Sequence, residues 1–340
     1  MNRKTVLFLD NTYPKAYQSS TLVEQAIGGT EASVIKTAQI LSAHYNVVVA
    51  QKYRIESCVE SKSLQFIPKF DINSIHPDYV VVLRKFPLLA QMQKQFPQAQ
   101  LFLWLHTFKN TEYAFKKPGL AKTKSTIICN SRTHQLDTLR LLNNTWLAKS
   151  FALFSLKTTV HYCYNPVAKP ENKKYKRNLN KLLFFSSPNK GLKQVIECFN
   201  HLLKNKPNLQ LYIANPGYKE DDGMKFNDRI TILGSLPHEE MMQHVAESLC
   251  VFYPQDSFAE TFGLIYAEAN AYQTLVLAHD IGAAREILHH NNPLIDTNNY
   301  QQIEQTINMW QENYPQVNYN PQFSDDFILN QWQSLFLKNT

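Results

Sequence analysis

Two glutamates eight positions apart, Glu260 and Glu268, have the spacing that says most about chemistry. They follow the apolar run 249–253, which predicts a buried strand, and Glu268 falls within the helical pattern of residues 261–271. On one helix the two carboxylates would be separated along the axis by roughly 10 Å, too far for the paired acids of a retaining glycosidase. The spacing suits two acids that bind hydroxyl groups at opposite ends of one extended ligand. The alternative is a surface helix with two solvated glutamates.

The start of that helix lies between the two glutamates, at Thr261, Phe262 and Gly263. A helix N-terminus presents unpaired N–H groups and a partial positive charge. These three residues are therefore expected to bind a pyrophosphate.

Two further turns have residues that suit a phosphate. Gly28 and Gly29 precede the helical pattern 30–43 and let a ligand approach the backbone closely, although a plain tight turn explains the pair equally well. Lys190, in the turn after the apolar run 182–185, would place a positive charge near a phosphate; the alternative is a surface lysine. Neither turn has the spacing of a dinucleotide fingerprint or a Walker loop.

His106 directly follows the apolar run 101–105, where an imidazole could hydrogen-bond a hydroxyl or a phosphate. A structural histidine is the commoner case. No Cys or His stands near it at metal-ligand spacing, and the five cysteines are scattered without a C-x-x-C pair. We therefore expect no metal site, and reduced cysteines that are mostly buried.

Short apolar runs alternate with amphipathic segments along the whole chain. Because the runs are apolar throughout, they predict parallel strands covered on both faces by helices, and hence an α/β fold. The polar stretch 168–181 separates two such halves. The expected strands are 5–9, 46–50, 79–83, 101–105, 126–129, 182–185, 209–214, 230–233, 249–253 and 275–278, and the expected helices are 30–43, 131–142, 192–203, 238–247, 261–271, 283–289 and 325–337.

Charge is distributed unevenly between the halves. Residues 1–165 contain 20 Lys and Arg against 9 Asp and Glu, a net charge of +11, whereas residues 166–340 have a net charge of −4. A basic half attracts partners that bear phosphate, such as nucleic acid, an anionic membrane surface or a charged small acceptor; a solvated basic surface that serves solubility explains the charge equally well. The basic residues are not interleaved with aromatic residues as in a known nucleic-acid module, so no specific nucleic-acid partner is expected.

Several of these segments resemble motifs of the retaining GT-B glycosyltransferases of family 4. Glu260 and Glu268, with Phe262-Gly263 between them, look like the Glu-x7-Glu motif of that family, and His106 stands where the family often has a sugar-contacting histidine. The other matching segments are Gly28-Gly29-x-Glu31, Tyr164-Asn165-Pro166-Val167, Ile232-Leu233-Gly234 and Ala278–Glu286.

The resemblance implies two Rossmann-like domains that face each other across a cleft: an acceptor-side domain of residues 1–165 and a nucleotide-sugar-binding domain of residues 166–323. A C-terminal helix within residues 324–340 would cross back to the first domain. Such enzymes transfer a hexose from a nucleotide-diphosphate sugar, here a UDP- or GDP-sugar, to a glycan, glycolipid or other anionic acceptor in the cleft, with retained anomeric configuration. No cofactor is implied.

The resemblance also implies roles for individual residues. Glu260 and His106 would be catalytic and contact the sugar, and Glu268 would hold the ribose. Lys190 would neutralise the pyrophosphate at the N-terminus formed by Thr261, Phe262 and Gly263, and the loop of Gly28 and Gly29 would close over it. The family usually has an Arg shortly before the Lys, where this chain has Ser186-Ser187-Pro188, so one positive charge is missing.

No apolar run reaches the length of a signal-peptide core or a membrane span, so we expect a cytoplasmic protein. The basic first domain would allow peripheral contact with the inner face of the membrane. Three alternatives remain open: a non-catalytic relative that binds sugar nucleotides, a basic nucleic-acid-binding protein, and an epimerase of the same fold.

Overall fold

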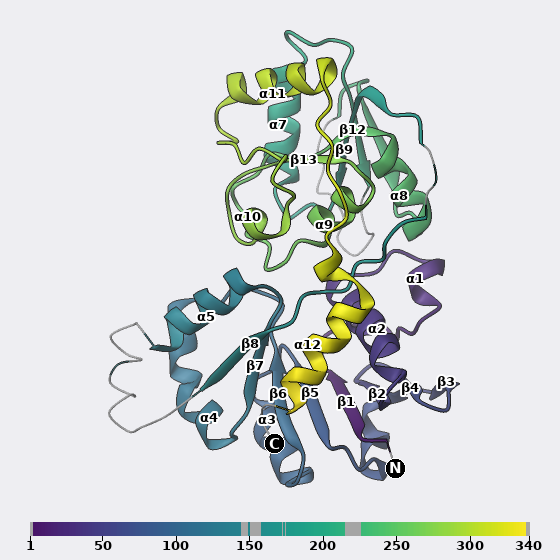
Figure 1. Ribbon diagram of the computed structural model, residues 1–340, viewed down its shortest axis with the longest axis vertical. Coiled ribbons are helices and arrows are strands. Elements are labelled where there is room, and N and C mark those ends of the chain that lie inside the picture. Colours follow the sequence, from purple (N-terminus) through teal and green to yellow (C-terminus); the bar gives the residue numbers. More distant parts are fainter. Residues whose placement is uncertain are drawn as a thin grey trace. The chain divides into compact units, whose positions relative to one another are not determined.

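The computed structural model describes residues 3–143, 149, 158–171, 173, 175–214 and 226–337. The chain divides into two compact units: Met1–Ser20, Gly29–Pro166 and Asp325–Thr340 form the first, and Thr21–Gly28 and Val167–Ser324 form the second (Figure 1). Residues 21–28 thus group with the second unit, although we expected them in the first domain. Of the expected C-terminal segment 324–340, residues 338–340 lie outside the described ranges, as do residues 1–2, 144–148 and 150–157 of the expected first domain.

The first unit is built on an eight-stranded sheet in the order β3-β4-β2-β1-β5-β6-β7-β8. All neighbouring strands run parallel except β3, which is antiparallel to β4. The strands are β1 (Thr5–Asp10), β2 (Asn46–Gln51), β3 (Cys58–Ser61), β4 (Leu64–Pro68), β5 (Tyr79–Leu83), β6 (Gln100–Trp104), β7 (Thr126–Cys129) and β8 (Thr159–Tyr162). Sequence reasoning missed β3, β4 and β8, which lie towards the two ends of the sheet and lack a continuous apolar run.

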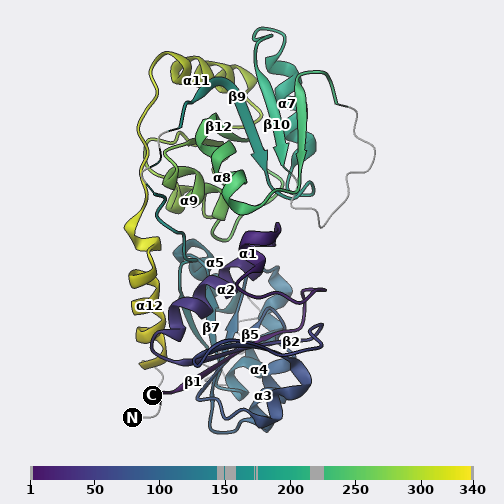
Figure 2. The same cartoon turned by 90° about the vertical axis from the view of Figure 1, so that its right-hand side faces the viewer.

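Helices cover both faces of this sheet (Figure 2). Leu7, Val80 and Leu103 face a core that α3 and α4 close, with Leu89 and Leu120 contributed from those two helices. The helices of the first unit are α2 (Gly29–Ser42), α3 (Leu88–Gln95), α4 (Lys117–Lys122), α5 (Arg132–Asn143) and α12 (Asp325–Leu337). Ser131 caps α5, because its Oγ accepts a hydrogen bond from the His134 N–H at 3.1 Å.

The C-terminal helix α12 completes the opposite face of the same sheet. The Trp332 ring lies 5.8 Å from that of Phe8 and 5.1 Å from that of Trp104, and Phe336 stacks on Tyr79 at 4.2 Å. Both α12 side chains are fully buried. The last helix therefore belongs to the core of the first unit.

The second unit has a five-stranded parallel sheet in the order β11-β10-β9-β12-β13. Its strands are β9 (Asn178–Phe185), β10 (Gln210–Ala214), β11 (Ile230–Gly234), β12 (Ser248–Tyr253) and β13 (Leu275–Ala278), and its helices are α1 (Thr21–Glu24), α7 (Leu192–Leu202), α8 (His238–Glu247), α9 (Leu264–Ala271), α10 (Ala284–Ile287) and α11 (Tyr300–Glu312). Both sheets with their flanking helices confirm the predicted α/β class. Within the described ranges, no helix combines the length and apolar composition that crossing a membrane requires.

Candidate functional site

The carboxyl ends of β9 and β12 meet at one edge of the second sheet because these strands are parallel neighbours. The turn of residues 186–191 follows β9 and leads into α7, and residues 254–263 follow β12 and lead into α9. In open parallel sheets this edge is where ligands bind. The fold therefore brings the two predicted ligand-binding segments of this unit to the same edge.

Lys190 and Glu260, 70 positions apart in the sequence, form an ion pair at this edge. Lys190 Nζ lies 2.8 Å from Glu260 Oε1, and the Tyr253 hydroxyl donates a hydrogen bond to the same oxygen at 3.3 Å. The Lys190 ammonium also lies 4.5 Å from the centre of the Phe258 ring. About a quarter of the lysine side chain is exposed, 26%, against 11% of the glutamate side chain. The two side chains that were predicted to bind the donor, a cation and a carboxylate, therefore lie side by side, and each is partly exposed to solvent.

Two loops fix the backbone around this pair. The side-chain amide of Gln255 accepts a hydrogen bond from the Phe258 N–H at 2.8 Å and donates one to the Phe258 carbonyl at 2.9 Å. After β13, the Ala283 N–H donates to the Glu260 carbonyl at 2.9 Å. Gly282 has a φ of +59°, and a Cβ there would lie only 2.6 Å from the Glu260 oxygen. Glycine at position 282 therefore lets this loop hold the Glu260 backbone.

The helix that carries Glu268 begins later than expected. It starts at Leu264, because Gly263 has a φ of +81°, a left-handed conformation that only glycine adopts readily. Residues 261–263 are therefore not helical, and the separation of roughly 10 Å, which assumed a helix from Glu260 onwards, does not apply. The Phe262 ring is buried and lies 5.0 Å from that of Phe323, so this side chain packs in the interior and only its backbone can reach a ligand.

Glu268 lies in different surroundings from Glu260. It is a buried residue of α9, and its Oε1 is 3.8 Å from Nε2 of His238, the first residue of α8. The two glutamates therefore face different partners. Nothing in the sequence pattern marked His238 as a neighbour of this site.

Ser186 and Ser187 occupy the turn before Lys190, where the resemblance led us to expect an arginine. Both are buried, and Ser186 is hydrogen-bonded to Tyr253. The Ser187 Oγ is buried without a hydrogen-bond partner among the residues that the structure describes. A buried hydroxyl in that state can bind a ligand oxygen without breaking a bond within the protein.

At the carboxyl edge of the first sheet, His106 follows β6 and packs against Trp104, with ring centres 4.6 Å apart. Its Nδ1 lies 3.2 Å from Nδ2 of Asn130, the residue after β7. Burial lowers the pKa of His106 well below its usual range, and the nearby Arg84, His134 and Lys109 lower it further. His106 is therefore neutral at neutral pH.

The glycine pair is divided between the two units. Gly29 is the first residue of α2 in the first unit, and its carbonyl accepts a hydrogen bond from the Ser33 Oγ at 2.7 Å. Gly28 ends the short segment that groups with the second unit. The expected helix start at Thr30 is thus one residue late.

A charged cluster at the same edge of the first sheet was not predicted. Arg84 follows β5, and its guanidinium lies 2.8 Å from Glu31 Oε1 and 3.6 Å from Asp10 Oδ1. The Tyr17 hydroxyl donates to Asp10 at 3.1 Å. Burial raises the pKa of Glu31, and Arg84 opposes that rise. The one available sequence signal was an arginine at a strand end, which by itself predicts nothing about its partners.

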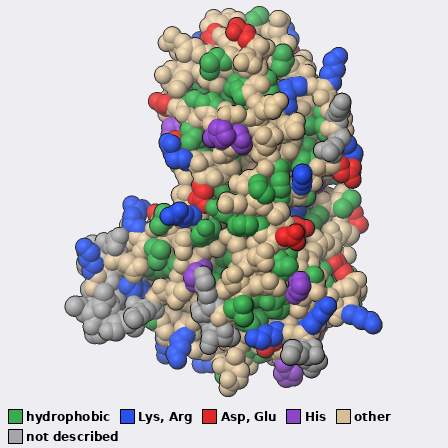
Figure 3. Space-filling model, in the orientation of Figure 1, with side chains coloured by type: hydrophobic (Ala, Val, Ile, Leu, Met, Phe, Trp, Pro, Cys, Tyr) green, Lys and Arg blue, Asp and Glu red, His purple; other side chains and the backbone are tan. Residues whose placement is uncertain are grey.

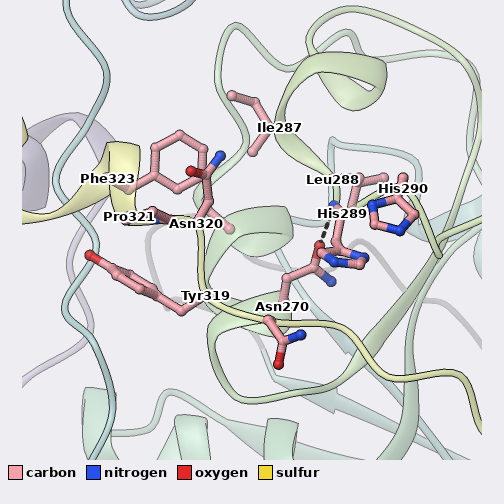
Figure 4. A pocket seen from close by; sticks show the side chains of 11 residues that line it. Asn270, Ile287, Leu288, His289, His290, Tyr319, Asn320, Pro321 and Phe323 are labelled. Atoms are coloured by element: carbon pink, nitrogen blue, oxygen red, sulfur yellow. Dashed lines mark hydrogen bonds between the residues drawn. The ribbon is translucent and has the colours of Figure 1, made fainter.

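A pocket of about 360 Å³ also lies in the second unit, beside α9 (Figure 4). Asn270, His289, His290 and Tyr319 are among the residues that line it, and the Asn270 Oδ1 accepts a hydrogen bond from the His289 N–H at 2.7 Å. None of the predicted site residues lines this pocket. Among the described residues, no group of three or more His, Cys, Asp or Glu side chains could hold a metal ion.

Two α/β units with mainly parallel sheets, and a last helix that packs on the first of them, define the class: the chain has the GT-B fold. Residues 169–322, which make up most of the second unit, match the family described as glycosyl transferases group 1. Lys190, Glu260 and Glu268 all lie inside this matched segment. No curated protein sequence matches the chain significantly.

Solved structures of the same fold match the chain over most or all of its length. The glycosyltransferase from Rickettsia africae has a TM-score of 0.66 at 14% identity and covers 100% of this chain and 99% of its own. Sucrose-phosphate synthase from Thermosynechococcus elongatus has a TM-score of 0.64 at 13% identity and covers 99% and 97%. TarM from S. aureus, in complex with UDP, α-GlcNAc-glycerol and fondaparinux, has a TM-score of 0.56 at 16% identity and covers 82% and 61%. At these identities the likeness shows the fold.

Proposed function

We propose that the protein transfers a hexosyl group from a UDP- or GDP-sugar to a glycan or glycolipid acceptor, with retained anomeric configuration. The observation that carries this proposal is the ion pair of Lys190 and Glu260 at the ligand-binding edge of the segment that matches glycosyl transferases group 1. A cation beside a carboxylate suits a donor that has a diphosphate at one end and sugar hydroxyls at the other.

In the proposed reaction, the bond between the anomeric carbon and the diphosphate oxygen breaks, and its electron pair stays on the departing nucleoside diphosphate. The acceptor hydroxyl forms the new bond on the same face, and its proton passes to the leaving phosphate oxygen. Lys190 and the backbone N–H groups at the start of α9 would stabilise the negative charge that develops. Glu260 would accept hydrogen bonds from the sugar hydroxyls, and Glu268 would bind the ribose hydroxyls.

The part of the proposal that concerns the acceptor rests on the net charge of the first 165 residues. Residues 1–165 have a net charge of +11, which favours an anionic glycan or glycolipid and allows peripheral contact with an anionic membrane surface. Lys and Arg side chains are spread over the first unit on the face seen in Figure 3.

The test of the class of function is thermal unfolding against a panel of UDP- and GDP-sugars, followed by a transfer assay with the donor that binds. A ligand present at 100 times its Kd stabilises the folded state by about 2.7 kcal/mol. We expect one donor to raise the unfolding temperature and to be consumed only when acceptor is present. Binding without turnover would favour a non-catalytic relative, and turnover without acceptor would favour an epimerase. Steeply salt-dependent nucleic-acid binding with no donor bound would overturn the proposal.

Ser187 gives a sharper test of where the diphosphate binds. Because its hydroxyl is buried without a partner among the described residues, Ser187→Ala should leave the free energy of unfolding unchanged or slightly higher. Loss of a hydrogen bond to the charged phosphate should weaken donor affinity roughly 10- to 150-fold. Isothermal titration with UDP and GDP measures this. Ser186→Ala is the matched control: it loses the bond to Tyr253 and should lower stability. Unaltered affinity in Ser187→Ala would place the diphosphate elsewhere.

A further inference from the structure

Three side chains at the carboxyl edge of the first sheet form a hydrogen-bonded chain. Trp104 ends β6, His106 follows two residues later, and Asn130 is the first residue after the parallel neighbour β7. The Trp104 Nε1–H donates to Asn130 Oδ1 at 2.7 Å, and Asn130 Nδ2 lies 3.2 Å from His106 Nδ1. Trp104 is fully buried and Asn130 is 2% exposed.

The chemistry of these groups determines which nitrogen of His106 carries the proton. An indole N–H can only donate, so the Asn130 atom that faces it must be the carbonyl oxygen. The amide nitrogen therefore faces His106, and an amide NH₂ can also only donate. The Nδ1 of His106 must consequently accept. In a neutral imidazole with an accepting Nδ1, the proton is on Nε2.

The surroundings of His106 also disfavour a second proton on the ring. Arg84 and Lys109 are positively charged groups close enough to act on it, His134 lies nearby, and the Trp104 ring covers one side. Burial and these charges lower the pKa of His106 well below its usual range. Both nitrogens thus have fixed roles at neutral pH: Nδ1 accepts and Nε2 donates.

We propose that Asn130, itself oriented by Trp104, is a positioning residue that fixes His106 in the Nε2–H tautomer, so that His106 serves as a neutral hydrogen-bond donor to a ligand oxygen and not as a general base. The tautomer follows from the contacts within the first unit alone. Only the identity of the ligand oxygen, on a sugar or a phosphate, rests on the proposed function.

His134 supplies an internal control. Its Nδ1 accepts a hydrogen bond from the backbone N–H of Asn130 at 3.3 Å, so its proton is also on Nε2. Burial lowers the pKa of His134 to about 3. Because the contact is with the backbone, a change of the Asn130 side chain should leave the tautomer of His134 unaltered.

The experiment is ¹⁵N NMR of the full chain labelled at histidine, recorded without ligand, with the His106 signals assigned from their loss in His106→Gln. In the natural protein we expect His106 to be neutral with Nε2 protonated. In Asn130→Asp the carboxylate can accept from both Trp104 and His106, so the proton should move to Nδ1 and the pKa of His106 should rise. The signals of His134 should not change, which also shows that the fold is intact.

A His106 protonated on Nδ1 in the natural protein would overturn the proposal, and so would an Nε2–H tautomer that persists in Asn130→Asp. If Asn130→Asp does not fold, Trp104→Phe removes the indole N–H that orients the amide and should give a mixture of both tautomers. A single Nε2–H tautomer in Trp104→Phe would contradict the role given to Trp104.

Activity then tests the consequence for the proposed reaction. Loss of one hydrogen bond to a neutral donor should lower kcat roughly 5- to 10-fold in Asn130→Asp and in His106→Gln. The kcat of the double variant Asn130→Asp/His106→Gln should be no lower than that of His106→Gln alone, because Asn130 acts through His106. Additive losses would contradict the proposed coupling. The NMR result does not depend on turnover, so a failure of the proposed function would leave it interpretable.

Discussion

Replacement of Glu260 by Gln should reduce turnover about 100-fold and leave the protein folded. The carboxylate would accept hydrogen bonds from sugar hydroxyls, and a hydrogen bond to a charged group contributes about 1.5–3 kcal/mol, which corresponds to roughly 10- to 150-fold in rate if it acts in the transition state. Gln keeps the shape of the side chain but removes the charge that pairs with Lys190. The measurement is kcat and KM with the donor identified by thermal unfolding.

Glu197→Gln is the matched control for this variant. Glu197 is an exposed residue of α7 in the same unit, and its contact with Lys193 is 3.9 Å long at the surface. The same chemical change at Glu197 should leave kcat and KM unaltered, since exposed ion pairs contribute little. Full activity in Glu260→Gln would refute the role given to this carboxylate.

Replacement of Trp332 by Ala should destabilise the protein by about 3–5 kcal/mol, the range for removal of a buried aromatic ring. The ring lies between Phe8 and Trp104 in the core of the first unit, so its loss leaves a cavity beneath the sheet. Denaturant unfolding of the full chain measures the change. Because α12 is the last described element, the size of the loss shows how much the C-terminal segment contributes to the first unit.

Ser334→Ala is the control within the same helix, because Ser334 is exposed. It should change the free energy of unfolding by less than about 0.5 kcal/mol. If Trp332→Ala were as stable as Ser334→Ala, the packing of α12 on the sheet would not support the first unit. Deletion of residues 324–340 should lower stability at least as much as Trp332→Ala.

Most strands of the two sheets could be predicted because their sequences are continuous apolar runs. Such runs can be buried only between two layers of helices, and this reasoning found β1, β2, β5, β6 and β7 as well as the strands of the second unit. It missed β3, whose residues are mainly exposed, and β8, which has one buried residue. Strands near a sheet end need less apolar sequence, so they leave a weaker pattern.

The start of α9 could not be placed from periodicity. The apolar pattern continues back to Thr261, but Gly263 adopts a left-handed conformation, so the helix begins only at Leu264. Likewise, the sequence did not indicate that the Phe262 ring packs against Phe323. The expected binding of a pyrophosphate by residues 261–263 concerned their backbone N–H groups and stays a prediction. The direction of the Phe262 side chain depends on Phe323, which lies about 60 residues away in the sequence.

The amino-acid sequence by itself determined the α/β class and the strand-to-turn positions of Lys190, His106 and Glu260, because local hydrophobic patterns and turn residues depend only on nearby positions. Only the tertiary structure decided that Lys190 meets Glu260, that Arg84 meets Glu31, and that Trp104 orients Asn130 against His106. These pairs form where parallel strands bring their carboxyl ends together. A partner across a sheet edge is set by strand order, which local sequence does not encode.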